Sequence, residues 1–175
     1  IKQLLINRYL SLKVNRLPYF LLLFRNMLIS GINSCTSCIL HNPEKIIEIF
    51  INIERKSYFS KLIEQNKLNN KTRLLKKNDF SKLGIKNDRF FNDIVVRREK
   101  YKPFILDDII KKNKKSLIVV ADQITDQNNL GNIIRTALLI GADGLLLSEH
   151  SSAEINEVTS LTSSGAVEVL KYHVS

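Results

Sequence analysis

The residue types best suited to chemistry follow one apolar run late in the chain. Residues 117–121 (LIVVA) are continuously apolar, which predicts a parallel strand buried on both faces. Residues 122–129 predict a loop at the carboxyl end of that strand, and residues 130–140 have the apolar spacing of a helix. Asn129 and Arg135 therefore bring an amide and a guanidinium to the mouth of a sheet, a combination suited to binding a phosphorylated ligand.

Arg135 is unusual for the charge around it. From Leu117 to Ser175 the chain holds seven acidic residues against only Arg135 and Lys171, a net charge of −5. A cation without basic neighbours suggests a specific anionic partner, and phosphate fits a guanidinium well. Gly131, near the start of the same helix, would leave a backbone N–H edge open to such a ligand. A purely structural arginine on a helix face is the alternative that the sequence leaves open.

The elements after this helix complete a sheet. Residues 145–147 and 167–174 predict two more strands, separated by a helix over residues 153–163. The order βαβαβ is that of an open Rossmann-like sheet, whose ligands bind beyond the carboxyl ends of the strands. The chain contains neither G-x-G-x-x-G after the first strand nor G-x-x-x-x-G-K-[ST], which disfavours a dinucleotide site and excludes a P-loop.

Another α/β unit precedes this sheet in the chain. Its pattern predicts alternating helices and strands, beginning with a helix after Ser30-Gly31-Ile32-Asn33 that runs through Leu40. The remaining expected elements are strands over 46–53, 72–75 and 94–96 and helices over 58–65 and 79–83, the last capped by Asp79. Cys35 and Cys38 fall on one face of the first helix, where small core residues are a better interpretation than a metal or redox site. We therefore expect no metal.

Charge and composition narrow the class of protein. The 175 residues are 44% hydrophobic and 25% charged, which is globular and excludes collagen-like or wholly disordered chains. Residues 44–116 hold twenty basic and ten acidic side chains, enough to grip the phosphates of an RNA, although a merely solvated lysine-rich face is the alternative. The candidate RNA-binding residues are Arg89, Arg97, Arg98 and Lys100. Two cysteines cannot form a multi-bridge scaffold, which favours a reducing compartment.

The chain divides into four segments on this evidence: 1–26, 27–99, 100–116 and 117–175. The first carries basic residues and no acid, as organelle transit peptides do, although the apolar part of a signal peptide or an ordinary amphipathic helix would also fit. The segment 100–116, with Pro103 and a lysine run, is expected to be a linker. No apolar run is long enough for a membrane span.

Four stretches together resemble one known family. The run 126–137 (DQNNLGNIIRTA) is similar to the first motif of the SpoU/TrmH RNA 2′-O-ribose methyltransferases of the SPOUT superfamily, and Ser164-Gly165-Ala166-Val167-Glu168 is similar to their S-x-G-A-x-E segment. Upstream, Ser30-Gly31-Ile32-Asn33 and Asn42-Pro43-Glu44 resemble the start of the family's ribosomal-protein-like substrate-binding domain. Gln127 departs from the proline usual in the family, which puts the shape of that loop in doubt.

The resemblance implies a fold and an activity. It implies an α/β protein in which a small substrate-binding domain precedes the Rossmann-like βαβαβ part of an α/β-knot methyltransferase domain, with the knot region beyond Ser175. It also implies an S-adenosylmethionine-dependent enzyme acting on RNA, ribosomal rather than transfer RNA, as a homodimer. Its catalytic residues would be Asn129, Arg135 and Glu168, and the motifs that bind the cofactor would lie beyond Ser175, so these residues alone are expected to be inactive.

The resemblance leaves the function, the cellular location and the general base open. A non-catalytic RNA-binding protein with a degenerate, truncated methyltransferase half is the alternative function. Mitochondrion or plastid is the expected location, with cytoplasm as the alternative. Because a guanidinium is a poor base, Arg135 is expected to bind the neighbouring phosphate and stabilise the developing alkoxide, while Asn129 orients groups nearby; the general base is not assigned.

Overall fold

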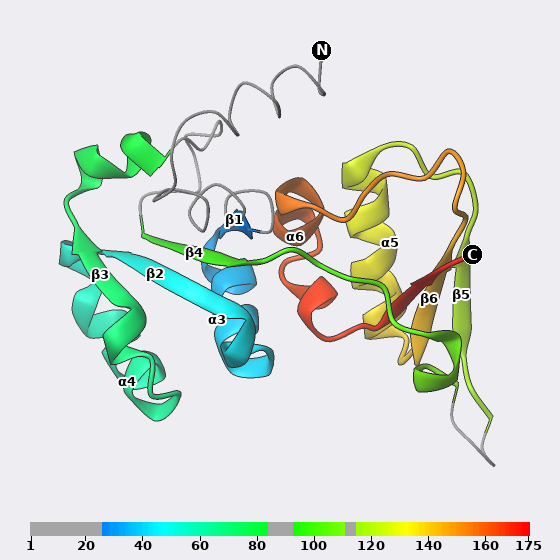
Figure 1. Ribbon diagram of the computed structural model, residues 1–175, viewed down its shortest axis with the longest axis horizontal. Helices are drawn as coiled ribbons and strands as arrows, with labels where there is room; N and C mark the ends of the chain where they lie inside the picture. The colour runs from blue at the N-terminus through cyan, green and yellow to red at the C-terminus, as the bar shows by residue number, and fades with distance from the viewer. Residues whose placement is uncertain (1–25, 84–92, 111–114) are drawn as a thin grey trace, which may run out of the picture.

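Two separate sheets organise the chain. The computed structural model describes residues 26–83, 93–110 and 115–175. A four-stranded sheet is built from the first part of the chain and a three-stranded sheet from the last, and the two lie side by side with helices between them (Figure 1). We call the part that holds the four-stranded sheet the first unit and the part that holds the three-stranded sheet the second unit. The mixed α/β class expected from the sequence is confirmed.

The four-stranded sheet has the order β1-β4-β2-β3. Its strands are β1 (Asn26–Ser30), β2 (Ile46–Asn52), β3 (Thr72–Leu75) and β4 (Ile94–Glu99). Strand β4 runs antiparallel to both β1 and β2, whereas β3 runs parallel to β2. Three of these strands were expected from the sequence; β1, which pairs Ile29 with Val96, was not.

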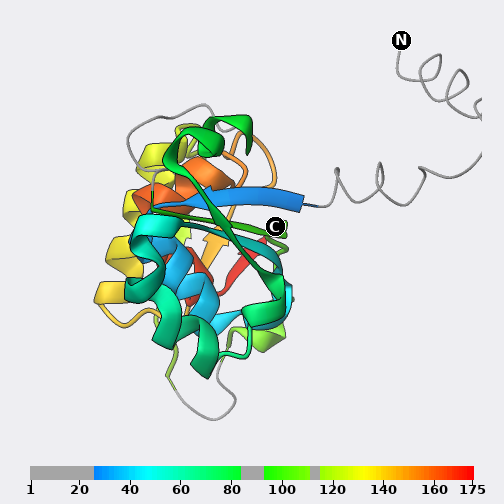
Figure 2. The same ribbon diagram turned by 90° about the vertical axis from the view of Figure 1, so that its left-hand side faces the viewer.

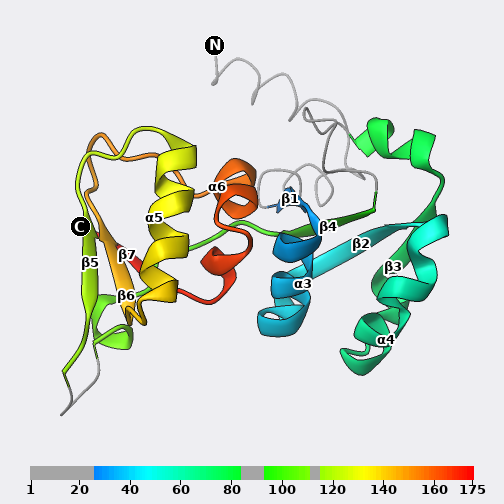
Figure 3. The same cartoon turned by 180° about the vertical axis from the view of Figure 1, so that it is seen from behind.

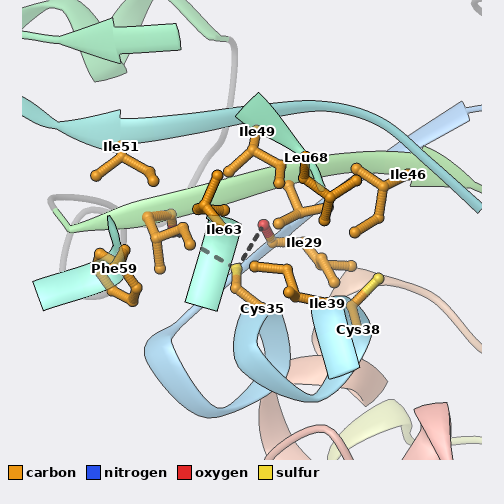
Figure 4. Close-up of a cluster of buried hydrophobic side chains, with 12 residues drawn as sticks. Ile29, Cys35, Cys38, Ile39, Ile46, Ile49, Ile51, Phe59, Ile63 and Leu68 are labelled. Atoms are coloured by element: carbon orange, nitrogen blue, oxygen red, sulfur yellow. Dashed lines mark hydrogen bonds between the residues drawn. The ribbon is translucent and has the colours of Figure 1, made fainter. Parts of the chain in front are cut away.

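Two helices cover one face of this sheet. They are α3 (Ile32–His41) and α4 (Lys56–Gln65), and both lie on the same side of the strands (Figures 1 and 2). Figure 4 shows the core they enclose, in which Cys35 and Cys38 pack among isoleucines from β2 and the neighbouring strands. Both thiols are free and buried, which confirms their interpretation as core residues.

The opposite face of the sheet is partly covered by a 3-10 segment. This segment, η4 (Lys77–Leu83), packs Phe80 against Phe50 and Val95. The expected α-helix over 79–83 with Asp79 as its cap is wrong, because the turn begins two residues earlier and the Asp79 carboxylate pairs with Lys82 at 2.6 Å instead. Burial of Phe80 fixes the segment.

The three-stranded sheet is parallel and has the order β5-β6-β7. Its strands are β5 (Ile118–Ala121), β6 (Gly144–Leu147) and β7 (Tyr172–Val174), and its helices are α5 (Gln127–Leu139) and α6 (Glu157–Thr162). Helix α5 lies against the sheet, and α6 lies between α5 and strand β1 of the first unit (Figure 3). Helix α6 thus joins the two units.

Two expectations about this sheet are wrong. The strand expected over 167–174 is a 3-10 turn, η6 (Ala166–Glu168), followed by the short β7, because Gly165 adopts a left-handed conformation at φ 82° and turns the chain. Strand β5 is not buried on both faces, since 69% of Val120 is exposed. It lies at an edge of the sheet formed by the described residues.

The segment expected to be a linker is packed where the structure describes it. The backbone N–H of Phe104 donates to Tyr172 O at 2.7 Å, and the ring Nδ1 of His173 lies 2.7 Å from Phe104 O. Ile109, after the turn η5 (Leu106–Asp108), is buried against Gly144. Residues 101–109 are therefore held on the second sheet. No helix among the described residues is long and apolar enough to cross a membrane.

Candidate active site and the contact between the two units

Helix α5 begins earlier than the sequence predicts. The Asp126 side chain accepts a hydrogen bond from Asn129 N at 2.8 Å and caps the helix, which starts at Gln127. Asn129 consequently lies in the first helical turn and not in a loop. Because a capped helix fixes its first turn, the Asn129 side chain projects from a rigid element into solvent.

Gly131 serves the packing of two helices. A Cβ at this position would lie 2.7 Å from Cβ of Thr162 and 3.1 Å from the carbonyl oxygen of Thr159, both in α6. Glycine is therefore required for α5 to approach α6 so closely. The backbone edge that the sequence offers to a ligand is buried here against α6, so the expected role of Gly131 in anion binding is wrong.

Arg135 is exposed on the outer surface of α5. It forms no ion pair or hydrogen bond with any other residue that the structure describes. Asn129 lies six positions earlier, about 120° away around the helix axis, so the two side chains do not share one face. Asn128, seven positions before Arg135, does share its face, and its side chain accepts a hydrogen bond from Thr162 at 3.1 Å.

Glu168 has a different environment from the other two expected catalytic residues. Its side chain is 0% exposed, in the turn η6. One carboxylate oxygen, Oε1, contacts Arg98 Nη1 and accepts a hydrogen bond from the Tyr101 hydroxyl, both at 2.6 Å. The other, Oε2, accepts from Asn42 Nδ2 at 2.9 Å. The carboxylate therefore faces the first unit and is shielded from solvent, which argues against direct contact with a substrate.

Arg98 is inside the protein and not on an RNA-facing surface. Its side chain is 5% exposed, and its guanidinium carbon lies 3.9 Å from the centre of the Tyr101 ring. Burial by itself lowers the pKa of Arg98, but attraction to Tyr101 and Glu168 outweighs it and the pKa is raised. Arg98 thus stays charged as the partner of Glu168, and the expectation that it binds RNA phosphates is not supported by its position.

Tyr101 is the donor that completes this group. Burial, followed by the nearby Glu168 charge, raises the pKa of Tyr101 well above its ordinary value. The hydroxyl therefore keeps its proton and donates a hydrogen bond to the carboxylate. The same hydroxyl oxygen lies 3.1 Å from Ser160 Oγ in α6. We call Asn42, Arg98, Tyr101 and Glu168 the interdomain cluster.

Helix α3 and its C-cap residue add three further contacts across the same boundary. Ser34 Oγ donates to Ser160 O at 2.8 Å, Ser37 Oγ donates to Gly165 O at 2.8 Å, and Asn42 Nδ2 donates to Glu168 O at 2.8 Å. Sequence reasoning missed these residues. The available signal was that the two short motifs near Gly31 and Gly165 both contain small polar residues, but nothing in their spacing showed that they meet.

The other candidate RNA-binding residues lie on different surfaces. Arg97 alternates with Val96 along β4, so its side chain lies on the sheet face opposite α3. There Arg97 and Arg73 share one carboxylate, that of Glu48. Lys100 is exposed beside a cavity at the second sheet. Arg89 lies outside the residues that the structure describes.

The cavity beside Lys100 has a volume of about 360 Å³ at the carboxyl ends of β6 and β7. Its polar lining includes Ser148, Glu149 and Glu154. The one buried side-chain polar atom without a hydrogen-bond partner among the described residues is Arg98 Nε, which belongs to the interdomain cluster. The cavity lining therefore offers no unpaired buried group that would identify a ligand. No cluster of metal-ligating side chains occurs in the described ranges either.

Comparison with known proteins identifies the second unit. Residues 116–175 match the model of the SpoU rRNA Methylase family. We call residues 116–175 the SpoU unit after this match. The resemblance expected from the 126–137 and 164–168 motifs is thereby confirmed, and it covers the whole three-stranded sheet.

Similar curated proteins methylate ribosomal RNA. The chain is 26% identical over 147 residues to 23S rRNA (guanosine-2'-O-)-methyltransferase RlmB of Haemophilus influenzae, covering 81% of this chain and 59% of that protein. It is 44% identical over 57 residues to the mitochondrial rRNA methyltransferase 1 of Schizosaccharomyces pombe, covering 33% of this chain and 19% of that protein. The chain thus spans about three-fifths of the RlmB length.

Solved structures share the fold. The SpoU methyltransferase AviRb from Streptomyces viridochromogenes, in complex with AdoMet, matches with a TM-score of 0.64 and 23% identity over 86% of this chain and 55% of that one. An AdoMet-bound rRNA methyltransferase from Sinorhizobium meliloti matches with a TM-score of 0.62 and 19% identity, over 86% and 54% of the two chains. At these identities the likeness establishes the fold, including the pairing of a small α/β unit with a SpoU sheet.

Proposed function

We propose that this protein is an RNA 2′-O-ribose methyltransferase that acts on ribosomal RNA. The family assignment and the rRNA-methylating relatives support the activity and substrate. The observation that carries the proposal is the state of Arg135: a solvent-exposed guanidinium on a rigid, capped helix, without an ion-pair partner among the described residues, inside the family's own segment.

In the proposed reaction Arg135 acts on the RNA. Its planar guanidinium binds the phosphate next to the target ribose and places the 2′-oxygen for attack. As the 2′-hydroxyl loses its proton, the positive charge stabilises the developing alkoxide. Asn129, held in the first turn of α5 by the Asp126 cap, projects from a different face of the helix and orients a neighbouring part of the bound RNA.

S-adenosylmethionine is the proposed methyl donor, because SpoU structures of this fold bind AdoMet. It supplies an electrophilic methyl group. The described side chains do not form a site fitted to it, since the cavity at β6 and β7 presents two carboxylates and no unpaired buried donor or acceptor. The part of the described residues in the reaction is therefore confined to the RNA.

The RNA also needs a binding surface on the first unit. Arg73 and Arg97 share Glu48, so this trio keeps one net positive charge, with the arginine side chains 69% and 33% exposed. Arg97 also lies over the Phe50 ring at 5.5 Å, which helps to fix its direction. We infer that this pair contacts RNA phosphates on the sheet face opposite α3.

The salt dependence of RNA binding tests this surface. Replacing both Arg73 and Arg97 by alanine should make the plot of log K for RNA binding against log salt concentration less steep, by the amount expected for the loss of about two phosphate contacts. Lys61→Ala, which removes an exposed cation from α4, is the matched control and should change the slope less. An unchanged slope in the double variant would remove this face from the binding surface.

The cellular assay tests the function itself. Mapping ribose methylation in organellar ribosomal RNA after loss of the gene should reveal the disappearance of a specific 2′-O-methyl group. The mitochondrial relatives make the mitochondrion the proposed location, and a plastid or the cytoplasm are the alternatives that the same mapping distinguishes. The homodimer implied by the family resemblance is also a proposal, tested by light scattering.

Arg135→Ala separates the enzyme from a non-catalytic RNA-binding protein. If the proposal is right, a gene encoding this variant should fail to restore the methyl group although the protein is present and binds RNA. Full restoration of methylation would remove Arg135 from the mechanism. If the gene encoding Arg135→Ala restores growth and the level of methylation never changes, the non-catalytic RNA-binding protein is favoured.

A further inference from the structure

We propose that Glu168 is a positioning residue that fixes the first unit onto the SpoU unit through Arg98, Tyr101 and Asn42. The lock itself stands on geometry. Only its effect on methylation rests on the proposed function. Its consequence is that the pair Arg73 and Arg97 and the exposed Arg135 are held at a fixed separation, so that one folded RNA has to fit both.

The first argument is the way the cluster spans the boundary. Arg98 comes from β4 of the first sheet, Asn42 from the end of α3, and Glu168 from η6 of the SpoU unit. Tyr101 lies only three residues after Arg98, where the chain leaves the first sheet. The carboxylate therefore ties together the last strand of one unit, the start of the connection and a turn of the other unit.

The second argument is direction. Hydrogen bonds and a buried ion pair require particular angles, whereas apolar surfaces slide at little cost. Here both carboxylate oxygens are engaged, and the two serine donors of α3, Ser34 and Ser37, add fixed directions along the same boundary. Such a contact specifies one orientation of the two units.

The third argument is how closely the backbones approach. A Cβ on Gly31 would lie 2.8 Å from Cδ1 of Leu161, and one on Gly165 would lie 2.6 Å from Cβ of Ser37. Each glycine belongs to one unit and meets a side chain of the other. The boundary is therefore closely packed at the carboxyl end of α6, at Leu161 and just beyond the helix at Gly165.

The distance between two spin labels tests the lock directly. Nitroxides at Lys61→Cys on α4 and Leu139→Cys on α5 report the separation of the units, because both positions are exposed. The native thiols compete poorly for the label, since burial raises the pKa of Cys35 and raises the pKa of Cys38 to about 12. Mass spectrometry confirms that two labels are present.

The parent protein should give one narrow distance distribution. Glu168→Gln removes the charge with almost no change in volume and should replace that peak by a broad or multiple distribution, while hydrogen exchange within β2 and β6 stays protected. Glu64→Gln, an exposed carboxylate on α4, is the matched control and should keep the narrow peak. A narrow, unshifted peak in Glu168→Gln would overturn the proposal.

A milder variant covers the possibility that Glu168→Gln does not fold. Tyr101→Phe removes one hydroxyl from the cluster and leaves the charge pair, and a broadened distribution would support the lock while an unchanged one would overturn it. A merely stabilising role would lower the unfolding midpoint and leave the distances of folded molecules unchanged. RNA affinity, measured separately, distinguishes failure of the lock from failure of the proposed function. If the distance distribution broadens in the variant but neither the parent protein nor the variant binds RNA, the lock is right and the proposed function is wrong.

Discussion

The two motifs that identify the SpoU unit have opposite environments. The first places Arg135 on the surface of α5 without a partner among the described residues, whereas the second places Glu168 in a shielded cluster where both carboxylate oxygens are engaged. A charge kept in solvent without a partner is available to a ligand. A charge whose partners are all internal holds structure together. The comparison separates a side chain that is free to meet a ligand, for which we propose RNA, from one whose partners all lie inside the protein.

The largest effect should come from deleting the buried charge. Glu168→Ala leaves the Arg98 guanidinium buried without its counter-ion, and the free energy of unfolding should fall by about 3–5 kcal/mol. Urea denaturation followed by circular dichroism measures it. Glu64→Ala, in an exposed helical position, should change stability little, and a similar small change for both variants would contradict the difference drawn here.

Two glycines with similar backbone angles, one at the boundary between the units and one away from it, test how tightly that boundary is packed. Gly165→Ala combines a left-handed φ of 82° with a contact at 2.6 Å to Ser37, and should cost about 2–4 kcal/mol from strain and overlap together. Gly141→Ala has a similar φ of 77° but nothing within 4 Å, so it should cost only the strain, about 1–2 kcal/mol. Thermal unfolding of both variants checks this, and equal losses would mean that the boundary near Gly165 is not tightly packed.

Alkaline pH should loosen the core beside the interdomain cluster. Burial, and then the Glu168 charge, raise the pKa of Cys38 from 9.0 to about 12. The pKa of Cys38 is higher in the folded protein than in the unfolded chain. The contribution of this thiol to the free energy of unfolding is therefore fully present below about pH 9, falls as the pH rises above that value, and is lost above about pH 12. Stability should decline by about 1.4 kcal/mol per pH unit for this proton in that window.

The control for this pH effect is Cys38→Ala, which should decline less steeply over pH 9–12. Tyr172, whose pKa burial raises to about 12, contributes in the same direction from about pH 10 and remains in both proteins. Urea denaturation at a series of pH values gives the slopes. Identical slopes for the two proteins would show that the Cys38 proton does not contribute.

The smallest effect on stability should come from Arg135→Ala. The side chain is exposed and makes no contact with described partners that the mutation would break, so the free energy of unfolding should change by less than about 0.5 kcal/mol. The same urea titration checks it. A loss comparable to that of Glu168→Ala would show that Arg135 is structural, and the contrast between the two motifs would disappear.

The sequence by itself predicted most of the local elements and the resemblance to the SpoU family. Apolar periodicity predicted α3, α4 and the strands β2, β3 and β6 because these depend on neighbours close in the chain. The motif around Arg135 was equally visible, because a capped helix carries its functional side chain within a dozen residues. Local spacing was enough to name Asn129 and Arg135 as candidates.

Only the tertiary structure decided the role of Glu168. Its partners are Asn42, Arg98 and Tyr101, and the nearest of them is 67 residues away in the chain. A carboxylate has the same appearance in a sequence whether it faces a substrate or a buried guanidinium. The difference lies in burial and in partners brought together by the packing of α6 between the two units, which no local pattern encodes.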